Sequence, residues 1–293
     1  MLSPDRPVLR HDSLDALLSA PQTLGRGAVA AVFCEDGVEV AGTARHLLAD
    51  GFGAVVLMLS PGVEGPALAG THEVPWDLSA PEPMPAALNR MIEALPGRWL
   101  HYCYNAEYLF HPFHGSRTVG EMLAFVAEER RASVLTYVVD LYATDLGAHP
   151  DAVDPAGAHL DRFGYYALAR KDPATGHPAE RQLDFYGGLR WRFEEHVPKA
   201  RRRIDRVGLF EARPGLRIRA DHTLSDPEMN TFACPWHNNP TAAICSFRTA
   251  KALKTNPGSM HEIGGFAWHG SEPFRWEAQQ LLALGLMEPG QWF

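Results

Sequence analysis

The strongest indication of the fold lies in residues 28–59, which read AVAAVFCEDGVEVAGTARHLLADGFGAVVLML. This segment begins with a run that is apolar on both alternating faces, Ala28–Cys34, and ends with a second such run, Ala54–Leu59. Continuous apolar runs are typical of parallel strands that helices cover on both sides. Between the runs, apolar residues recur at positions 40, 44, 47 and 48, which is helical spacing, and Gly51 follows as a helix terminator. The segment therefore predicts a strand–helix–strand unit with a right-handed crossover.

The rest of the chain continues the alternation of strands and helices. A Thr118–Glu121 capping box begins a helix that we expect to reach Arg131. Further helices are expected at 86–95, 242–253 and 276–286, and strands at 99–104, 133–142, 165–168, 207–211 and 216–219. We therefore predict a single α/β domain, a Rossmann-like mixed sheet flanked by helices with an elaborated C-terminal half. It would span residues 28–286, between an N-terminal extension (1–27) and a C-terminal tail (287–293).

The composition is that of an ordinary globular protein. Of the 293 residues, 46% are hydrophobic and 21% are charged, and every apolar run is shorter than the roughly 18 residues that a membrane helix needs. The first 15 residues lack the basic-then-apolar order of a signal peptide, so we expect a cytoplasmic protein without a transmembrane segment. Four widely spaced cysteines, at 34, 103, 234 and 245, are interpreted as reduced thiols.

The net charge of −8 argues against a nucleic-acid-binding protein, which normally presents a basic surface. The charge is uneven, because residues 190–219 contain ten Lys or Arg residues and four acids. Such a basic segment suits a small anionic ligand such as a diphosphate, or an anionic surface. A solvated, salt-bridged face is the alternative interpretation.

Several familiar motifs are absent from the sequence. It has no Gly-x-x-x-x-Gly-Lys loop, no Gly-x-Ser-x-Gly elbow and no His-Glu-x-x-His helix, and Gly25 and Gly27 precede the first predicted strand instead of following it. These absences argue against P-loop NTPases, α/β-hydrolases and classical dehydrogenases. In an open α/β sheet, ligands bind beyond the carboxyl ends of the strands. Glu35 and Asp36 follow the first predicted strand, and Asn105 and Glu107 follow the strand at 99–104. These four residues are candidates for ligand binding, although Glu35 and Asp36 could instead cap the next helix.

Residues 84–109 contain a helix with Asn89 and Arg90, a strand that begins with Trp99, and then the sequence Tyr-Asn-Ala-Glu-Tyr-Leu at 104–109. This order resembles the nucleotide-sugar glycosyltransferases of the GT-A fold, in particular the bacterial family 2-like proteins, with their Asp-x-Asp-Glu-Phe-Leu motif. Glu107 and the two residues after it match the end of the motif. Tyr104 and Ala106 stand at the positions of its two aspartates.

The resemblance implies transfer of a sugar from a nucleotide-diphosphate sugar to a saccharide or lipid-linked acceptor, in the cytoplasm or peripherally at the inner membrane face. Family members hold a divalent metal (Mn or Mg) with the two aspartates. Alanine offers no ligand atom and neutral tyrosine is a poor ligand for a hard cation, so this metal route is not expected here. Two alternatives remain: arginines replace the metal, or the protein is a non-catalytic glycosyltransferase-like binding protein.

The resemblance also assigns roles to individual residues. Glu35 and Asp36 would contact the nucleoside, Asn105 and Glu107 would lie beside the diphosphate, and His222 would contact phosphate. Further donor-binding candidates are the arginines Arg90, Arg190, Arg192 and Arg202.

Two segments of the C-terminal half, 182–196 and 234–239, are rich in polar, aromatic and glycine residues, as binding sites often are. Within them, Glu194, Glu195 and His196 are candidate proton acceptors for an inverting transferase, with Glu195 preferred. The alternative is that both glutamates pair with nearby arginines on the surface. Trp236 could stack on a sugar ring, with His237 beside it.

A zinc-dependent hydrolase is a third and weaker hypothesis. His111 and His114 flank Pro112–Phe113, and Cys234 and His237 have Cys-x-x-His spacing, but neither pair completes a set of four ligands in register. Asp140 interrupts an apolar run, so we expect it to have a partner or a functional role.

Overall fold

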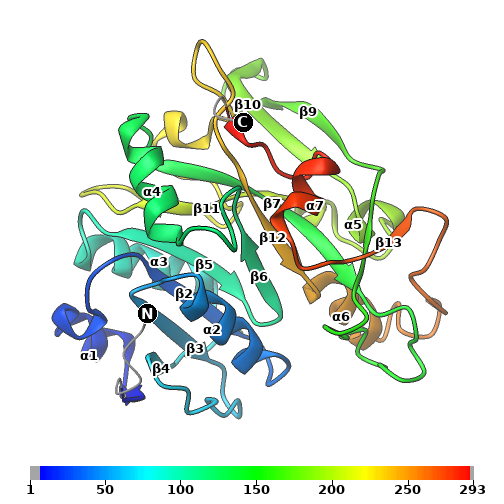
Figure 1. The fold of residues 1–293 in the computed structure, drawn as a ribbon, viewed down its shortest axis with the longest axis horizontal. Helices are drawn as coiled ribbons and strands as arrows, with labels where there is room; N and C mark the ends of the chain where they lie inside the picture. Colours follow the sequence, from blue (N-terminus) through cyan, green and yellow to red (C-terminus); the bar gives the residue numbers. More distant parts are fainter. Residues whose placement is uncertain (1–6, 291–293) are drawn as a thin grey trace. The chain divides into compact units, whose positions relative to one another are not determined.

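The computed structural model describes residues 7–290 and has an α/β fold with a large mixed sheet flanked by helices (Figure 1). The chain forms two compact units. The first contains the described residues up to Leu109, together with Phe113–Val134 and Val207–Asn230. The second contains Phe110–Pro112, Leu135–Arg206 and the described residues from Thr231 onward. Each unit is assembled from separate segments, so no single linker marks a boundary in the sequence.

The first unit is built on strands in the order β1-β4-β3-β2-β5-β11. Neighbours from β1 to β5 are parallel, whereas β11 is antiparallel to β5. The bounds are β1 (Leu9–Arg10), β2 (Val29–Cys34), β3 (Ala54–Leu59), β4 (Thr71–Pro75), β5 (Trp99–Tyr104) and β11 (Asp205–Glu211); a further strand, β6, spans Glu107–Phe110.

Strand β2 lies at the centre of this sheet and is buried along its whole length. Its residues pair in register with β3 on one side and with β5 on the other. Burial on both faces explains why β2, β3 and β5 show continuous apolar runs instead of alternation.

Helices α2 (Val40–Ala49) and α3 (Pro83–Ala94) lie on opposite faces of the sheet (Figure 1). Opposite faces follow from right-handed crossovers, because the chain moves outward from β2 to β3 and returns across them from β4 to β5. Helix α4 (Val119–Glu128) begins with the predicted capping box. The remaining short elements of this unit are α1 (Leu14–Leu18), η1 (Pro21–Leu24) and η3 (Pro227–Asn230).

The second unit has two parallel neighbours, β7 (Ser133–Tyr142) and β12 (Ala242–Ser246). Strand β8 (His159–Asp161) is antiparallel to both β7 and β13 (Ser271–Pro273). A separate hairpin pairs β9 (Tyr166–Lys171) with β10 (Pro178–Tyr186). Its helical elements are α5 (Leu189–Arg192), η2 (Lys199–Arg201), α6 (Arg248–Thr255) and α7 (Ala278–Ala283).

Most predicted strands are confirmed, and the strands at 54–59, 99–104 and 133–142 have the expected bounds. The helix at 242–253 is wrong in its first half, because Ala242–Ser246 is a strand that pairs with β7 and is buried on both faces. The strand at 216–219 is also wrong: the described chain has only an isolated bridge there, between Ile218 and Leu224. Within the predicted N-terminal extension, Leu9–Arg10 adds strand β1 to the sheet. Residues 1–6 of that extension and 291–293 of the predicted tail lie outside the described residues.

Among the described residues, no helix has the length and apolar character needed to cross a membrane.

The capping box of α4 provides a test of the fold. Thr118 accepts a hydrogen bond from the backbone of Glu121, and the Glu121 carboxylate accepts one from the backbone N–H of Thr118. We expect Thr118→Ala to lower the free energy of unfolding by about 1 kcal/mol, measured by urea denaturation. The matched control is Ser116→Ala, which removes an exposed hydroxyl bonded to a loop carbonyl. Equal effects of both substitutions would contradict the capping role.

Candidate functional site

The sheet of the first unit reverses its strand order between β2 and β5, so a crevice for a ligand is expected beyond the carboxyl ends of these strands. The structure brings Glu35, Asp36 and Asn105 together at this position. The backbone N–H of Glu35 donates to Asn105 Oδ1 (2.9 Å), and Asn105 Nδ2 donates to Asp36 Oδ1 (2.7 Å) and to the carbonyl of Val38 (2.8 Å). The Asn105 side chain therefore links the ends of the two strands.

The residues that follow β5 form a tight turn. Ala106 is buried and has a positive φ of 61°, and its backbone N–H donates to Thr43 Oγ1. The buried Glu107 carboxylate accepts a hydrogen bond from the backbone of Tyr104, while the Tyr104 ring packs against Phe33. These contacts give Asn105 and Glu107 a structural role in the turn.

A larger space lies beside this crevice, beyond the carboxyl ends of β3 and β4. It is a cavity of about 580 Å³. Its walls come from the end of β1, the turn after β3 and the end of β4, with the lining residues Arg10, His11, Leu59, Ser60, Pro61, Gly62, Val63, Glu73, Val74, Pro75, Trp76 and Asp77. The volume is within the range of small-molecule sites, roughly 300–1,000 Å³.

The cavity combines an aromatic wall with a few polar groups. The Trp76 indole donates from Nε1 to the carbonyl of Pro83, and the Arg90 guanidinium lies over its ring at 5.7 Å from the centroid. Asp77 is exposed and holds the turn at Ser79 through a backbone hydrogen bond of 2.9 Å. Arg90 is thus the predicted donor-binding residue that contacts the lining of the cavity.

Strand β1 supplies the basic residue of the cavity lining, Arg10, and His11 follows it. Arg10 Nε donates to the Glu73 carboxylate at 2.9 Å, and the Arg10 side chain remains largely exposed. The His11 ring stacks on His72 at 5.3 Å between centroids, with a hydrogen bond of 3.1 Å between ring nitrogens. Partial burial lowers the pKa of His11, against the opposing effect of Asp12. His11 is therefore neutral at pH 7.

The predicted proton acceptors lie in surface ion pairs. Glu194 pairs with Arg202 at 2.9 Å, and both side chains are partly exposed. Glu195 lies 3.7 Å from His196, whose other acidic neighbour is Glu262 at 3.4 Å. Glu194 thus has the arginine partner that was the alternative to catalysis, whereas the neighbour of Glu195 is a histidine.

Arg190 and Arg192, in contrast, reach two buried aspartates of the second unit. Arg192 donates to both carboxylate oxygens of Asp161, at 3.0 and 3.2 Å. Asp161 Oδ1 also accepts hydrogen bonds from the hydroxyl of Tyr142 and from Trp268 Nε1, each at 2.6 Å. Asp161 is therefore fully engaged in a buried hydrogen-bond network.

Asp140 lies near the end of β7, and its buried carboxylate has fewer and longer contacts with hydrogen-bond donors than that of Asp161. Its Oδ1 is 3.8 Å from Arg190 Nε, and its Oδ2 accepts a long hydrogen bond of 3.4 Å from the Arg190 backbone. Burial raises the pKa of Asp140, and the charge of Arg190 and the hydroxyl of Thr249 only partly oppose this effect. The sequence expectation of a partner for Asp140 is confirmed by Arg190.

The remaining predicted residues lie on loops. His222 has a positive φ of 66°, and its ring stacks on Tyr102 and shares a hydrogen bond of 3.0 Å with the Tyr102 hydroxyl. Trp236 is 81% exposed, and Cys234 Sγ lies 3.1 Å from His237 Nδ1. In the second unit, Trp236 is thus available to a partner, whereas His237 is engaged with a cysteine.

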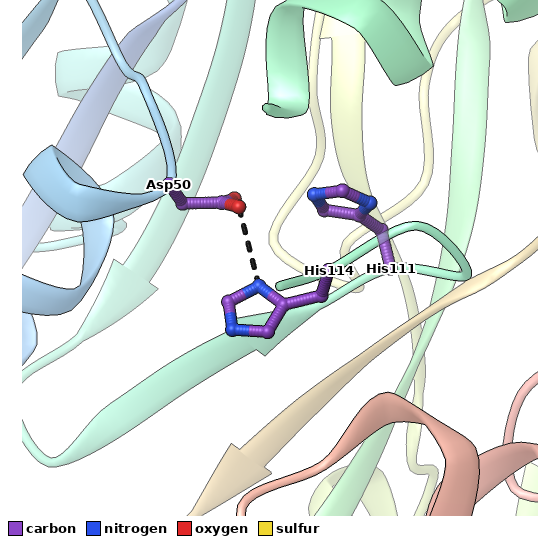
Figure 2. A group of neighbouring side chains, drawn as sticks. All are labelled: Asp50, His111 and His114. Carbon is purple, nitrogen blue, oxygen red and sulfur yellow. Dashed lines mark hydrogen bonds and ion pairs between the residues drawn. The ribbon is translucent and has the colours of Figure 1, made fainter. Parts of the chain in front are cut away.

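A group of possible metal ligands involves residues that the sequence had only partly indicated. One ligand atom each from Asp50, His111 and His114 lies within 4.8 Å of the others, and Figure 2 shows the three side chains pointing toward one another. His114 Nδ1 is 3.2 Å from Asp50 Oδ1 in a hydrogen-bonded pair. Two imidazoles and a carboxylate are ligand types that zinc accepts. Asp50 follows α2 and carries no motif, which explains why the sequence did not single it out.

Sequence reasoning missed the lining of the large cavity, including Trp76 and Asp77. The sequence analysis did not recognise strand β4, because it contains His72 and Glu73 and so lacks an apolar run. Once β4 is known, the rule for carboxyl ends indicates the residues that follow it.

No family model matches the sequence, and a comparison with curated proteins also finds no match.

Gly188 tests the tight packing around Asp140. It has a φ of 61°, and a Cβ there would lie 2.8 Å from Asp140 Oδ2. With a ψ of −150°, Gly188 lies in a region that essentially only glycine adopts, so we expect Gly188→Ala to destabilise the protein by more than the roughly 1–3 kcal/mol of backbone strain alone. Gly176→Ala is the matched control, because Gly176 has a φ of 70° and open space around it. Thermal unfolding of the two variants gives the comparison, and equal losses would show that Asp140 does not restrict this position.

The raised pKa of Asp140 predicts a pH-dependent contribution to stability. The folded state holds the Asp140 proton more tightly than the unfolded state, so wild-type stability falls as pH rises from the unfolded pKa, about 3.9, through the folded one. Asp140→Asn lacks this contribution. We therefore expect the stability of wild type relative to Asp140→Asn to decline between pH 4 and pH 7, in denaturant titrations at each pH. A constant difference would contradict the raised pKa.

Proposed function

We propose that the protein is a glycosyltransferase-like protein that binds a nucleotide-diphosphate sugar in the cavity at the carboxyl ends of β3 and β4. The observation that carries the proposal is this cavity of about 580 Å³ at the edge of a parallel sheet where α/β proteins bind ligands. The described strand order β4-β3-β2-β5, with antiparallel β11 beside β5, is compatible with the GT-A arrangement suggested by residues 84–109.

The lining suits the parts of such a donor. The Trp76 ring offers a flat face for a base, and stacking of this kind contributes about 1–3 kcal/mol. Ser60 and the exposed Asp77 carboxylate can accept hydrogen bonds from ribose hydroxyls. Arg10, exposed at the entrance, supplies positive charge for phosphate.

Of the two alternatives, the geometry favours a protein that binds the nucleotide sugar without metal-dependent transfer. Tyr104 and Ala106 are both buried and stand at the Asp-x-Asp positions, so these positions offer a metal no pair of carboxylates. The neighbouring Glu107 carboxylate accepts a hydrogen bond from the Tyr104 backbone. Glu194 and Glu195 form surface ion pairs, so they do not supply a sheltered base. Transfer to a saccharide or lipid-linked acceptor, and the cytoplasmic or membrane-peripheral location, remain predictions.

The proposal is tested by thermal unfolding with a panel of nucleotides and nucleotide sugars, each with manganese and with a chelator. A ligand at a hundred times its Kd stabilises by about 2.7 kcal/mol, which raises the melting temperature by roughly five degrees or more in a protein of this size. We expect such a rise with one nucleotide class, equal with manganese and with chelator. No rise with any nucleotide would refute binding, and a rise only with manganese would refute the metal-free mode.

Substitutions in the cavity lining test whether the nucleotide binds there. Asp77→Asn and Trp76→Leu are expected to reduce the nucleotide-induced rise, because an amide oxygen is a weaker, uncharged acceptor for ribose hydroxyls and leucine lacks the stacking face. Asp172→Asn is the matched control, since Asp172 is a partly exposed aspartate that also holds a turn through backbone hydrogen bonds. An undiminished rise in both cavity variants would place the nucleotide elsewhere.

A further inference from the structure

The second unit contains a smaller cavity, of about 200 Å³, between β7, the hairpin β9–β10 and the segment after α7. Four aromatic side chains line it: Tyr137, Tyr165, Tyr166 and Phe185. The Tyr137 and Phe185 rings are in contact, with centroids 4.6 Å apart. The other lining residues are aliphatic or glycine, except for Glu288. The cavity is thus an aromatic enclosure with one acid.

The lining of this cavity carries a negative charge but no positive charge. Its described residues include no lysine, arginine or histidine, and the Glu288 side chain is exposed. Glu288 lies close enough to Tyr137 to add to the effect of burial, which raises the pKa of the Tyr137 phenol and keeps it neutral. The faces of aromatic rings carry partial negative charge, so rings and carboxylate favour a positive ligand.

We propose that this cavity binds a small organic cation of the trimethylammonium class, a quaternary ammonium or a trimethylated amine. Aromatic enclosures of this kind recognise such cations through the ring faces. At roughly 30 Å³ per water molecule, the volume of about 200 Å³ corresponds to about seven waters, which suits a compact head group and is too small for a nucleotide sugar. The inference does not depend on the proposed nucleotide site, which lies in the first unit.

The lining argues against two other occupants. A sugar needs many hydrogen-bond partners, whereas the polar atoms of this lining are a few tyrosine hydroxyls and one carboxylate. The Tyr165 hydroxyl is itself buried and receives no hydrogen bond from the described residues, and burial among Asp161 and Asp140 raises its pKa. A hydrocarbon chain would gain nothing from Glu288.

The test compares choline with its neutral carbon isostere, 3,3-dimethyl-1-butanol, by isothermal titration calorimetry. The two molecules have the same shape and differ in the positive charge. We expect choline to bind, and the isostere to bind at least about tenfold more weakly, because it lacks the attraction to the ring faces. Equal affinity would show an apolar pocket, and absence of choline binding at the highest accessible concentration would also overturn the proposal.

Two variants test the walls of the cavity. Tyr166→Leu keeps an apolar side chain but removes a ring face, and Tyr166 is 45% exposed, so the fold tolerates the change. We expect about tenfold weaker choline binding. Glu288→Gln is expected to weaken binding severalfold at low salt and less at high salt.

The matched control is Phe163→Leu. Phe163 is an aromatic residue of the same unit with similar exposure, 41%, and it does not line the cavity. Its choline affinity should equal that of wild type, with circular dichroism confirming that all variants are folded. An affinity of Tyr166→Leu equal to that of wild type, or an equal loss in Phe163→Leu, would overturn the assignment.

Discussion

Strand β2 has parallel neighbours on both sides and buries every residue from Val29 to Cys34. A strand in this position needs a helix layer over each face, and right-handed connections provide these layers only if the chain leaves β2 in one direction and returns in the other. Because β2, β3, β4 and β5 are parallel, their carboxyl ends lie at one edge of the sheet. Both the Asn105 turn and the large cavity lie at that edge.

The two places at this edge differ in what their polar atoms do. Beside β2 and β5, the amide of Asn105 bonds to backbone groups of Glu35 and Val38, and the carboxylate of Glu107 accepts a hydrogen bond from the backbone of Tyr104. Beside β3 and β4, the Ser60 and Asp77 side chains face a space large enough for a ligand. Residues 104–107 therefore form a hydrogen-bonded turn, while the neighbouring cavity has the volume of a small-molecule site.

Several strands that are buried along almost their whole length could be predicted from the sequence. Strands β3, β5 and β7 have apolar runs with clear bounds, and Glu35, Asp36 and Asn105 were correctly placed after strands. That these residues come together depends on the pairing of β2 with β5, which the structure provides. Strand β4 could not be predicted, because His72 and Glu73 are buried only through partners at His11 and Arg10, more than 60 residues away. The segment 242–246 was misassigned because its alanines favour a helix, whereas pairing with β7 decides its structure.

Strand β1 is only two residues long, yet it covers part of the backbone edge of β4 that would otherwise be unpaired. A five-residue strand at the edge would offer its unpaired backbone groups to any other extended chain. Leu9 and Arg10 cover β4, and the edge that remains is short and carries a positive side chain. The N-terminal segment therefore protects the sheet from pairing between copies of the protein. A protease that cut after Arg10 would leave the core strands intact but open β4 as a template for aggregation.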